Sequence, residues 1–503
     1  MNELKKEGKE EKLSAWLKDK YNLLFIAIII FSFILLLYYF NLTKNQTLWW
    51  DEAEYMSMAK NWAFGTFEYN NPQRPILFPF LAFLIYSIGF NEAVIKFLLV
   101  LLPTFLAVFF TYFLIKEMYD KRTALIASFI TGVSWIHLFY AMRFMTDALG
   151  LFFGILAFFC FWKGYINNKG RKFIWLFGFF VALSFLSRLT GILYGVVILL
   201  FLFVTERFKF LKNKHLWIAV FIFLLTISPY LIWSYSQFGN PFAFRAGYGG
   251  AGSTQLGWWM FSLLYDYPEL VFFIFFLLGL LTIIPMFLSL DIMLIKKDKK
   301  YYNDLFMFLS ILFTLAFFIY FVRLVENRWL ILMSIGIFTF SAKGILLAYD
   351  FVRKKAGKIL PILLIILIIA SGTYFQLKHA DFIIKEKIPS YQPIKEAALW
   401  MKENSQPNDV VLSVSYTQTI FYSERKVYTY SEMSEEEFDK LVKEVNPKHI
   451  MVSVLEPHHP AWSYNLPEKY QKIMSPAQVW FADAEKQQPI LIIYKFNQSL
   501  TNA

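Results

Sequence analysis

The segment Trp49–Tyr55 carries the first residues that could take part in proton transfer, because Asp51 and Glu52 directly follow two tryptophans. Carboxylates are favoured in the first turn of a helix, where the helix dipole is positive. If Asp51 opens a helix, Glu54 and Tyr55 lie on its side of that helix, at a spacing of three and four residues. The pattern therefore has two interpretations: a helix cap, or a carboxylate placed to accept a proton.

Asp147 is a second acidic candidate, at the end of the segment Arg143–Asp147 and the start of a strongly apolar run. Helix capping again explains a carboxylate at such a place. An ionisable residue beside a hydrophobic helix of this kind is also a functional candidate, because burying a charge there is costly. His137 and Arg143, which precede Asp147, are candidates for the same polar cleft.

Three arginines stand at the ends of apolar runs, where they could bind an anion. Arg74 directly precedes Pro75, Arg188 lies between two short apolar runs, and Arg328 follows Glu326 at the start of another run. A guanidinium group binds phosphate through two parallel hydrogen bonds, so several arginines together suit an anionic head group. For each arginine alone, the alternative is a long side chain that reaches from a membrane helix to the polar interface.

Long hydrophobic helices must position these residues. Hydrophobic residues make up 57% of the 503 residues and charged residues only 17%, against roughly 25% charged in soluble proteins. The 58 phenylalanines gather in apolar runs of roughly 17–25 residues, the length that crosses ~30 Å of hydrocarbon. The net charge of +12 comes from Lys and Arg in short segments between the runs, which indicates cytoplasmic loops and no nucleic-acid partner. The composition predicts a polytopic α-helical membrane protein.

The basic segments order the expected spans, because an even number of crossings separates two cytoplasmic loops. This rule excludes Pro75–Phe90 as a span and favours a helix at the outer interface. About eleven spans remain, with the N-terminus in the cytoplasm and the C-terminus outside the cell membrane. They are Leu23–Phe40, Ala93–Ile115, Thr123–Tyr140, Ala148–Ile166, Phe173–Ser187, Gly191–Val204, Leu216–Tyr235, Leu270–Ile295, Leu305–Val322, Trp329–Tyr349 and Ile359–Phe375.

The composition becomes more polar after the last span, and helix and strand patterns alternate. Helices are expected at Tyr391–Asn404 and Glu435–Val445, and apolar strands at Val410–Val414, His449–Leu455 and Pro489–Phe496. This alternation predicts a small α/β domain. The expected organisation is a cytoplasmic segment at 1–22, a transmembrane domain at 23–376 with its first outer loop at 41–92, and an extracytoplasmic domain at 377–503.

The order and spacing of these motifs resemble those of the protein O-mannosyltransferase-like family (glycosyltransferase family 39). That family belongs to the glycosyltransferase C (GT-C) superfamily, together with the related lipid A aminoarabinose transferases. The resemblance covers about the first 350 residues. The motifs that carry it are Asp51-Glu52, Arg74-Pro75, Arg143–Asp147, the basic hairpin tip Leu186–Gly191 and the Arg328-Trp329 pair.

The resemblance implies a membrane glycosyltransferase. It would take a sugar from a polyprenyl- or dolichyl-phosphate donor and transfer it, with inversion, to a hydroxyl of a protein, lipid or glycan acceptor on the outer face of the membrane. Asp51 would be the general base, with Glu52 and Asp147 as acidic partners in the cleft. Such chemistry is coherent, because an attacking hydroxyl needs a proton acceptor.

Arg74, Arg188 and Arg328 would hold the phosphate of the lipid donor, whose leaving charge needs preorganised cations. No cofactor is certain from the resemblance, and the participation of a divalent cation stays open. The segment Asn70–Arg74 lacks the acidic residue that precedes the basic one in some relatives, which leaves the sugar contact open. Further candidates for the cleft are Glu54, Tyr55, Arg143, His137 and Glu326.

A secondary transporter or a flippase of a lipid-linked or anionic substrate is the alternative class. A transporter would place ionisable residues near the bilayer midplane and would contain inverted repeats. In this sequence the candidate charges stand at the expected outer ends of the spans, and the two halves of the hydrophobic region show no repeat. We therefore favour sugar transfer.

Overall fold

The computed structural model describes residues 16–244, 256–289, 301–323, 326–456, 459–471, 473–483 and 485–497. Most of the predicted cytoplasmic segment 1–22 lies outside these residues. The chain divides into two compact units. The first, which we call the helical unit, contains residues 1–44, 75–78 and 96–385. The second, which we call the loop–sheet unit, contains residues 45–74, 79–95 and 386–503.

Long apolar helices make up most of the helical unit. Within the described residues, nine helical segments are long and apolar enough to cross a membrane. Such runs form helices in a bilayer because a helix satisfies all its backbone polar groups internally. The main helices of these segments are α2 (Lys20–Thr43), α6 (Leu102–Met118), α9 (Asp147–Phe161), α11 (Ile192–Glu206), α12 (Lys214–Phe238), α14 (Glu269–Leu280), α17 (Tyr302–Phe317), α18 (Ser334–Ala356) and α19 (Ile359–Lys387).

Two further predicted spans correspond to shorter helices. The helix α7 (Lys121–Val133) has 13 residues and ends where Ser134 adopts an extended backbone, before the short α8 (Trp135–Tyr140). The helix α10 (Arg171–Ser187) has 17 residues. The segment predicted to lie at the interface forms α4 (Leu77–Ser87), whose 11 residues span about 16 Å at 1.5 Å per residue. That length is too short for the hydrocarbon core. The fold is thus a polytopic helical membrane protein, as predicted.

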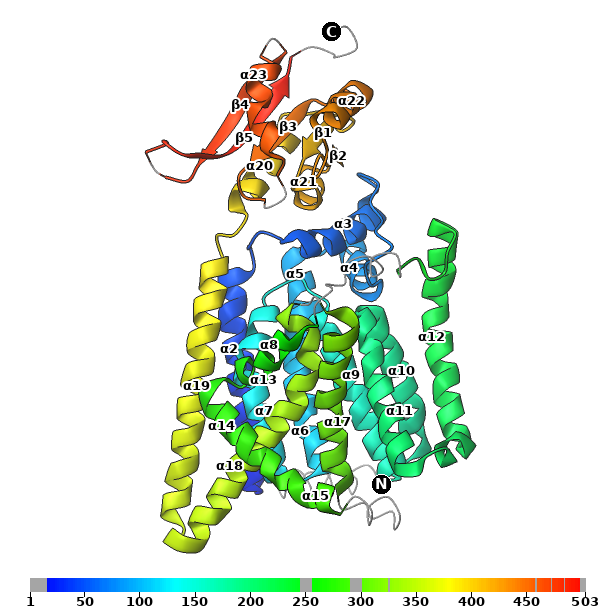
Figure 1. Ribbon diagram of the computed structural model, residues 1–503, viewed down its shortest axis with the longest axis vertical. Coiled ribbons are helices and arrows are strands. Elements are labelled where there is room, and N and C mark those ends of the chain that lie inside the picture. Colours follow the sequence, from blue (N-terminus) through cyan, green and yellow to red (C-terminus); the bar gives the residue numbers. More distant parts are fainter. Residues whose placement is uncertain are drawn as a thin grey trace, which may run out of the picture. The chain divides into compact units, whose positions relative to one another are not determined.

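Close backbone contacts hold neighbouring helices of this unit together. The helices α14 and α18 lie side by side (Figure 1). A Cβ atom at Gly279 would lie 1.8 Å from the carbonyl oxygen of Phe340, so only glycine fits there. The pair that carries the candidate residues, α9 and α10, is joined by a hydrogen bond from Ser184 Oγ to the Gly150 carbonyl, at 2.8 Å. This bond brings the start of α9 next to the end of α10.

A five-stranded sheet with the order β2-β1-β3-β5-β4 forms the core of the loop–sheet unit. The strands β1, β2 and β3 are parallel, whereas β5 runs antiparallel to β3 and β4. The small α/β domain is therefore present, as predicted. The strands are β1 (Val410–Ser413), β2 (Lys426–Tyr428), β3 (His449–Ser453), β4 (Met474–Phe481) and β5 (Pro489–Phe496).

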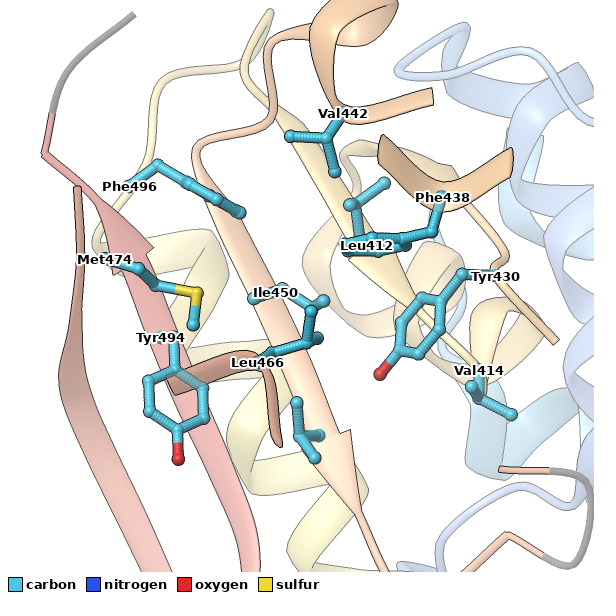
Figure 2. Close-up of a cluster of buried hydrophobic side chains, with 11 residues drawn as sticks. Leu412, Val414, Tyr430, Phe438, Val442, Ile450, Leu466, Met474, Tyr494 and Phe496 are labelled. Carbon is cyan, nitrogen blue, oxygen red and sulfur yellow. The ribbon is translucent and has the colours of Figure 1, made fainter. Parts of the chain in front are cut away.

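The helices of this domain bury their apolar faces on the sheet. Figure 2 shows Phe438 and Val442 of α22 (Glu435–Val445) in one buried cluster with Leu412 of β1 and Ile450 of β3. Ser434 caps α22 by accepting a hydrogen bond from the Glu437 amide. The other helices are α20 (Gln392–Glu403), α21 (Tyr416–Ser423) and α23 (Leu466–Lys469).

The helix α3 (Trp50–Phe64), from the first loop, packs against α21 within the same unit. Tyr422 accepts a hydrogen bond from the Leu48 amide at 2.9 Å. At the other end of α3, the Lys60 ammonium lies 2.6 Å from the Glu424 carboxylate. The contacts thus group the loop that carries Asp51 with the C-terminal sheet.

Candidate active site

The first turn of α3 separates the roles of its two adjacent carboxylates. The Trp49 amide donates a hydrogen bond to Glu52 Oε2 at 2.7 Å, so Glu52 caps the helix. Asp51 instead faces Arg74, whose Nη2 lies 2.6 Å from Asp51 Oδ1. The sequence allowed Asp51 to be the helix cap, but Glu52 makes the capping contact. Asp51 forms an ion pair with Arg74 instead.

Arg74 joins the two carboxylates on one side of α3. Its Nε contacts Glu54 Oε2, while its Nη2 binds Asp51. The guanidinium also lies 5.6 Å from the centre of the Tyr55 ring. We call Asp51, Glu54 and Arg74 the loop cluster. When both carboxylates are ionised, two negative charges share one positive charge, so the loop cluster is negative overall.

The two carboxylates of the loop cluster differ in environment. The Glu54 side chain is only 4% exposed, and this burial raises the pKa of Glu54, opposed by the Arg74 guanidinium and a hydrogen bond from Tyr69. Asp51 is more accessible, with 22% of its side chain exposed. Solvent and small molecules can therefore reach Asp51 more easily than Glu54. Burial together with the nearby Glu54 charge raises the pKa of Tyr69, which keeps its hydroxyl protonated.

A second group of charges gathers in the helical unit, at the start of α9. Asp147 is fully buried and binds Arg188 Nη1 through Oδ1. Arg328 Nη1 lies 3.7 Å from the other carboxylate oxygen, Oδ2. We call Asp147, Arg188 and Arg328 the helix-end cluster. Two cations share one anion, so this cluster is positive overall. Glu326 lies outside this count: it accepts hydrogen bonds from Arg328 Nε at 2.7 Å and Nη2 at 3.1 Å and offsets part of its charge, although its side chain is 58% exposed and so is screened by water.

The helix-end cluster borders a pocket that is lined by both polar and apolar side chains. Arg188 donates a hydrogen bond from Nε to Thr190 Oγ1 at 3.0 Å, and its guanidinium lies 5.8 Å from the centre of the Trp329 ring. These contacts hold the guanidinium at the pocket wall. The lining consists of Asp147, Gly150, Leu151, Ser184, Arg188, Thr190, Gly191, Leu193, Tyr194, Trp329, Ile331 and Leu332.

Two of the remaining candidates, His137 and Arg143, are buried side chains of the helical unit. His137 lies on α8, and its Nε2 is 3.1 Å from Ser334 Oγ of α18, which is a buried contact between helices. Arg143 is 1% exposed, in the turn between α8 and α9. Sequence reasoning missed Tyr69 and Tyr194 because no local pattern distinguishes them from other buried tyrosines. Within the described residues, no group of three or more His, Cys, Asp or Glu could hold a metal ion.

Known proteins match this chain in part of its sequence and over most of its fold. The family of dolichyl-phosphate-mannose-protein mannosyltransferases matches residues 73–233, which include Arg74, Asp147 and Arg188. Comparison with curated proteins gives no sequence match. ArnT from Cupriavidus metallidurans, in the apo state, is 13% identical with a TM-score of 0.67, over 96% of this chain and 98% of that chain.

Two other solved structures have the same fold. ArnT bound to undecaprenyl phosphate is 12% identical, with a TM-score of 0.65, over 94% of this chain and 97% of that chain. The Archaeoglobus fulgidus oligosaccharyltransferase with a tethered acceptor peptide is 12% identical, with a TM-score of 0.64, over 87% of this chain and 70% of that chain. The fold and the family match together place this chain in the GT-C superfamily of membrane glycosyltransferases.

Proposed function

We propose that this protein transfers a sugar from a polyprenyl- or dolichyl-phosphate donor to an acceptor hydroxyl at the outer face of the membrane. The observation that carries the proposal is the opposite charge of the two clusters. The helix-end cluster pairs two arginines with one buried carboxylate, which suits the charge that develops on a departing phosphate. The loop cluster pairs two carboxylates with one arginine, which suits proton removal from a hydroxyl.

Asp51 is the proposed general base. It is the more exposed carboxylate of its cluster, and Glu52 supplies the helix cap in its place. In one inverting step, the acceptor oxygen bonds to the sugar carbon while the bond from that carbon to the phosphate oxygen breaks. The acceptor proton passes to Asp51, and polyprenyl phosphate leaves with the bonding electrons. The contacts of Arg74 support a role in positioning Asp51. They use only Nε and Nη2, so the remaining guanidinium protons can still bind the donor phosphate.

The solved relatives support the substrate classes. One ArnT structure contains undecaprenyl phosphate, and an oligosaccharyltransferase structure contains a dolichol-phosphate and an inhibitory peptide. For this chain we propose a lipid-phosphate sugar as donor and a protein, lipid or glycan hydroxyl as acceptor.

A transfer assay tests the proposed reaction. Membranes of the source organism, which contain the native acceptor, are supplied with a panel of polyprenyl-phosphate sugars that carry a radiolabelled sugar. We expect the label to move from the lipid fraction to an acceptor, and unlabelled polyprenyl phosphate to appear in equal amount. A transporter or flippase would move the donor without breaking its bond to the sugar. Movement of intact donor across the membrane with no bond cleavage would therefore favour that alternative class.

We also propose that the N-terminus is cytoplasmic and that the sheet domain lies outside. The single Cys160 is buried, so introduced cysteines can be labelled without background. We expect cysteine at the exposed Asn408 to react with an impermeant maleimide in intact cells. Cysteine at the exposed Lys212, in a predicted cytoplasmic loop, is the control and should react only after lysis. The reverse result would overturn the proposed orientation.

A further inference from the structure

Tyr194 is a buried polar residue of the pocket with no role in the mechanism so far. It lies on α11, is 3% exposed and contributes to the pocket wall beside Asp147 and Arg188. Its ring packs where α9 has a glycine: a Cβ atom at Gly154 would lie 2.0 Å from the Tyr194 Cζ atom. The ring of Phe158 contacts it edge-on, with 5.0 Å between centroids. Tyr194 is therefore held in one place by close packing.

The Tyr194 hydroxyl is buried and has no hydrogen-bond partner within the described residues. Leaving a hydroxyl in this state is unfavourable, because it has lost its bonds to water without replacement. Phenylalanine would fill the same space without that cost. Because Tyr194 lines the pocket, a ligand bound there could supply the missing partner of this hydroxyl.

The neighbouring groups define the chemistry of that ligand. Arg188 presents a guanidinium at the same pocket. Thr190 accepts a hydrogen bond from Arg188 Nε, so the proton of its own hydroxyl can be donated elsewhere. With Tyr194, three donor groups line one pocket, and the Arg188 guanidinium among them favours a ligand with anionic oxygens. Apolar side chains such as Leu151, Leu193 and Leu332 form the rest of the wall and limit competition from water, which strengthens such bonds.

We propose that Tyr194 donates a hydrogen bond to the phosphate of the lipid donor and so completes a phosphate site with Arg188 and Thr190, which line the same pocket. This inference rests on the proposed function, since it takes the pocket as the place where the donor phosphate binds. Tyr194 is then a specificity-determining residue: it recognises the phosphate that distinguishes a polyprenyl phosphate from the corresponding alcohol.

The substitution Tyr194→Phe tests this role, because it removes one oxygen atom and leaves the ring. The purified protein is titrated with undecaprenyl phosphate, and binding is followed by the shift in melting temperature. We expect the dissociation constant to rise about ten- to a hundred-fold, as for loss of a hydrogen bond to a charged group. Without ligand, we expect an unchanged or higher melting temperature, because an unsatisfied polar group has been removed.

Tyr112→Phe is the matched control. Tyr112 lies on α6, is 1% exposed and also has a buried hydroxyl without a partner in the described part of the chain, but it does not line the pocket. Its substitution should affect the melting temperature of the free protein in the same direction as Tyr194→Phe and leave lipid binding unchanged. The control therefore separates loss of a buried hydroxyl from loss of a ligand contact.

Undecaprenol, which lacks the phosphate, and inorganic phosphate complete the titrations. Equal binding of undecaprenyl phosphate by the wild type and Tyr194→Phe would overturn the role of Tyr194 and leave the proposed function intact. Equal binding of undecaprenol and undecaprenyl phosphate by the wild type would contradict the donor site itself, and the role of Tyr194 with it. Inorganic phosphate that binds as tightly as the lipid would overturn the assignment to a lipid donor. A lower melting temperature together with weaker binding would assign Tyr194 to packing alone.

Discussion

Asp51→Asn is expected to lower the rate of sugar transfer by about a hundred- to ten-thousand-fold, the usual contribution of a general base. Asparagine has nearly the same shape as aspartate but cannot take the acceptor proton. The substitution should leave α3 in place, because Glu52 makes the capping contact and α21 packs along the helix. The measurement is the initial rate of transfer in membranes, normalised to the amount of inserted protein.

Asp350→Asn is the matched control for this experiment. Asp350 also pairs with an arginine, Arg122, at 3.1 Å, but it belongs to neither cluster. The same chemical change there should leave transfer unchanged. Glu52→Gln should also retain most activity, since the amide oxygen of glutamine can still accept the Trp49 hydrogen bond. If Asp51→Asn retains most activity while Glu54→Gln abolishes it, the base would be Glu54.

Arg188→Ala is expected to have the second largest effect, on the use of the donor. A hydrogen bond to a charged group contributes about 1.5–3 kcal/mol, so we expect KM for the lipid donor to rise about ten- to a hundred-fold. Arg188→Lys should restore binding only in part, because lysine keeps the charge but cannot form two parallel bonds to phosphate. Steady-state rates over a range of donor concentrations measure the effect.

The stability of the variant must be measured beside its kinetics. Asp147 is fully buried and binds Arg188 directly, so loss of the arginine leaves a buried carboxylate with only the longer contact to Arg328. Breaking a buried ion pair costs about 3–5 kcal/mol. Arg188→Lys keeps a cation next to Asp147. It therefore separates loss of the contact to the donor phosphate from loss of the buried ion pair. The control is Arg171→Ala. Arg171 is exposed at the start of α10, the helix that ends next to Arg188. Unchanged donor dependence in a folded Arg188→Ala protein would remove Arg188 from the donor site.

The sequence by itself determined the class of fold, because the signals for membrane helices are local. A run of apolar residues of sufficient length forms a helix in a bilayer whatever its neighbours are. The cap of α22 at Ser434 is local in the same way, since its bonds join residues three apart. Local signals were weaker where elements are short. The strands β2 and β4 and the helix α21 were not predicted, and the predicted span Thr123–Tyr140 is divided at Ser134.

Only the tertiary structure decided which charges pair. The three arginines looked equivalent in the sequence, each at the end of an apolar run. In the structure, Arg74 binds two carboxylates of α3, whereas Arg188 and Arg328 share the buried Asp147. Arg328 and Asp147 are 181 positions apart, and their approach depends on how whole helices pack. The sequence thus supplied the candidate residues for proton transfer and phosphate binding, and packing divided them into a negative and a positive cluster.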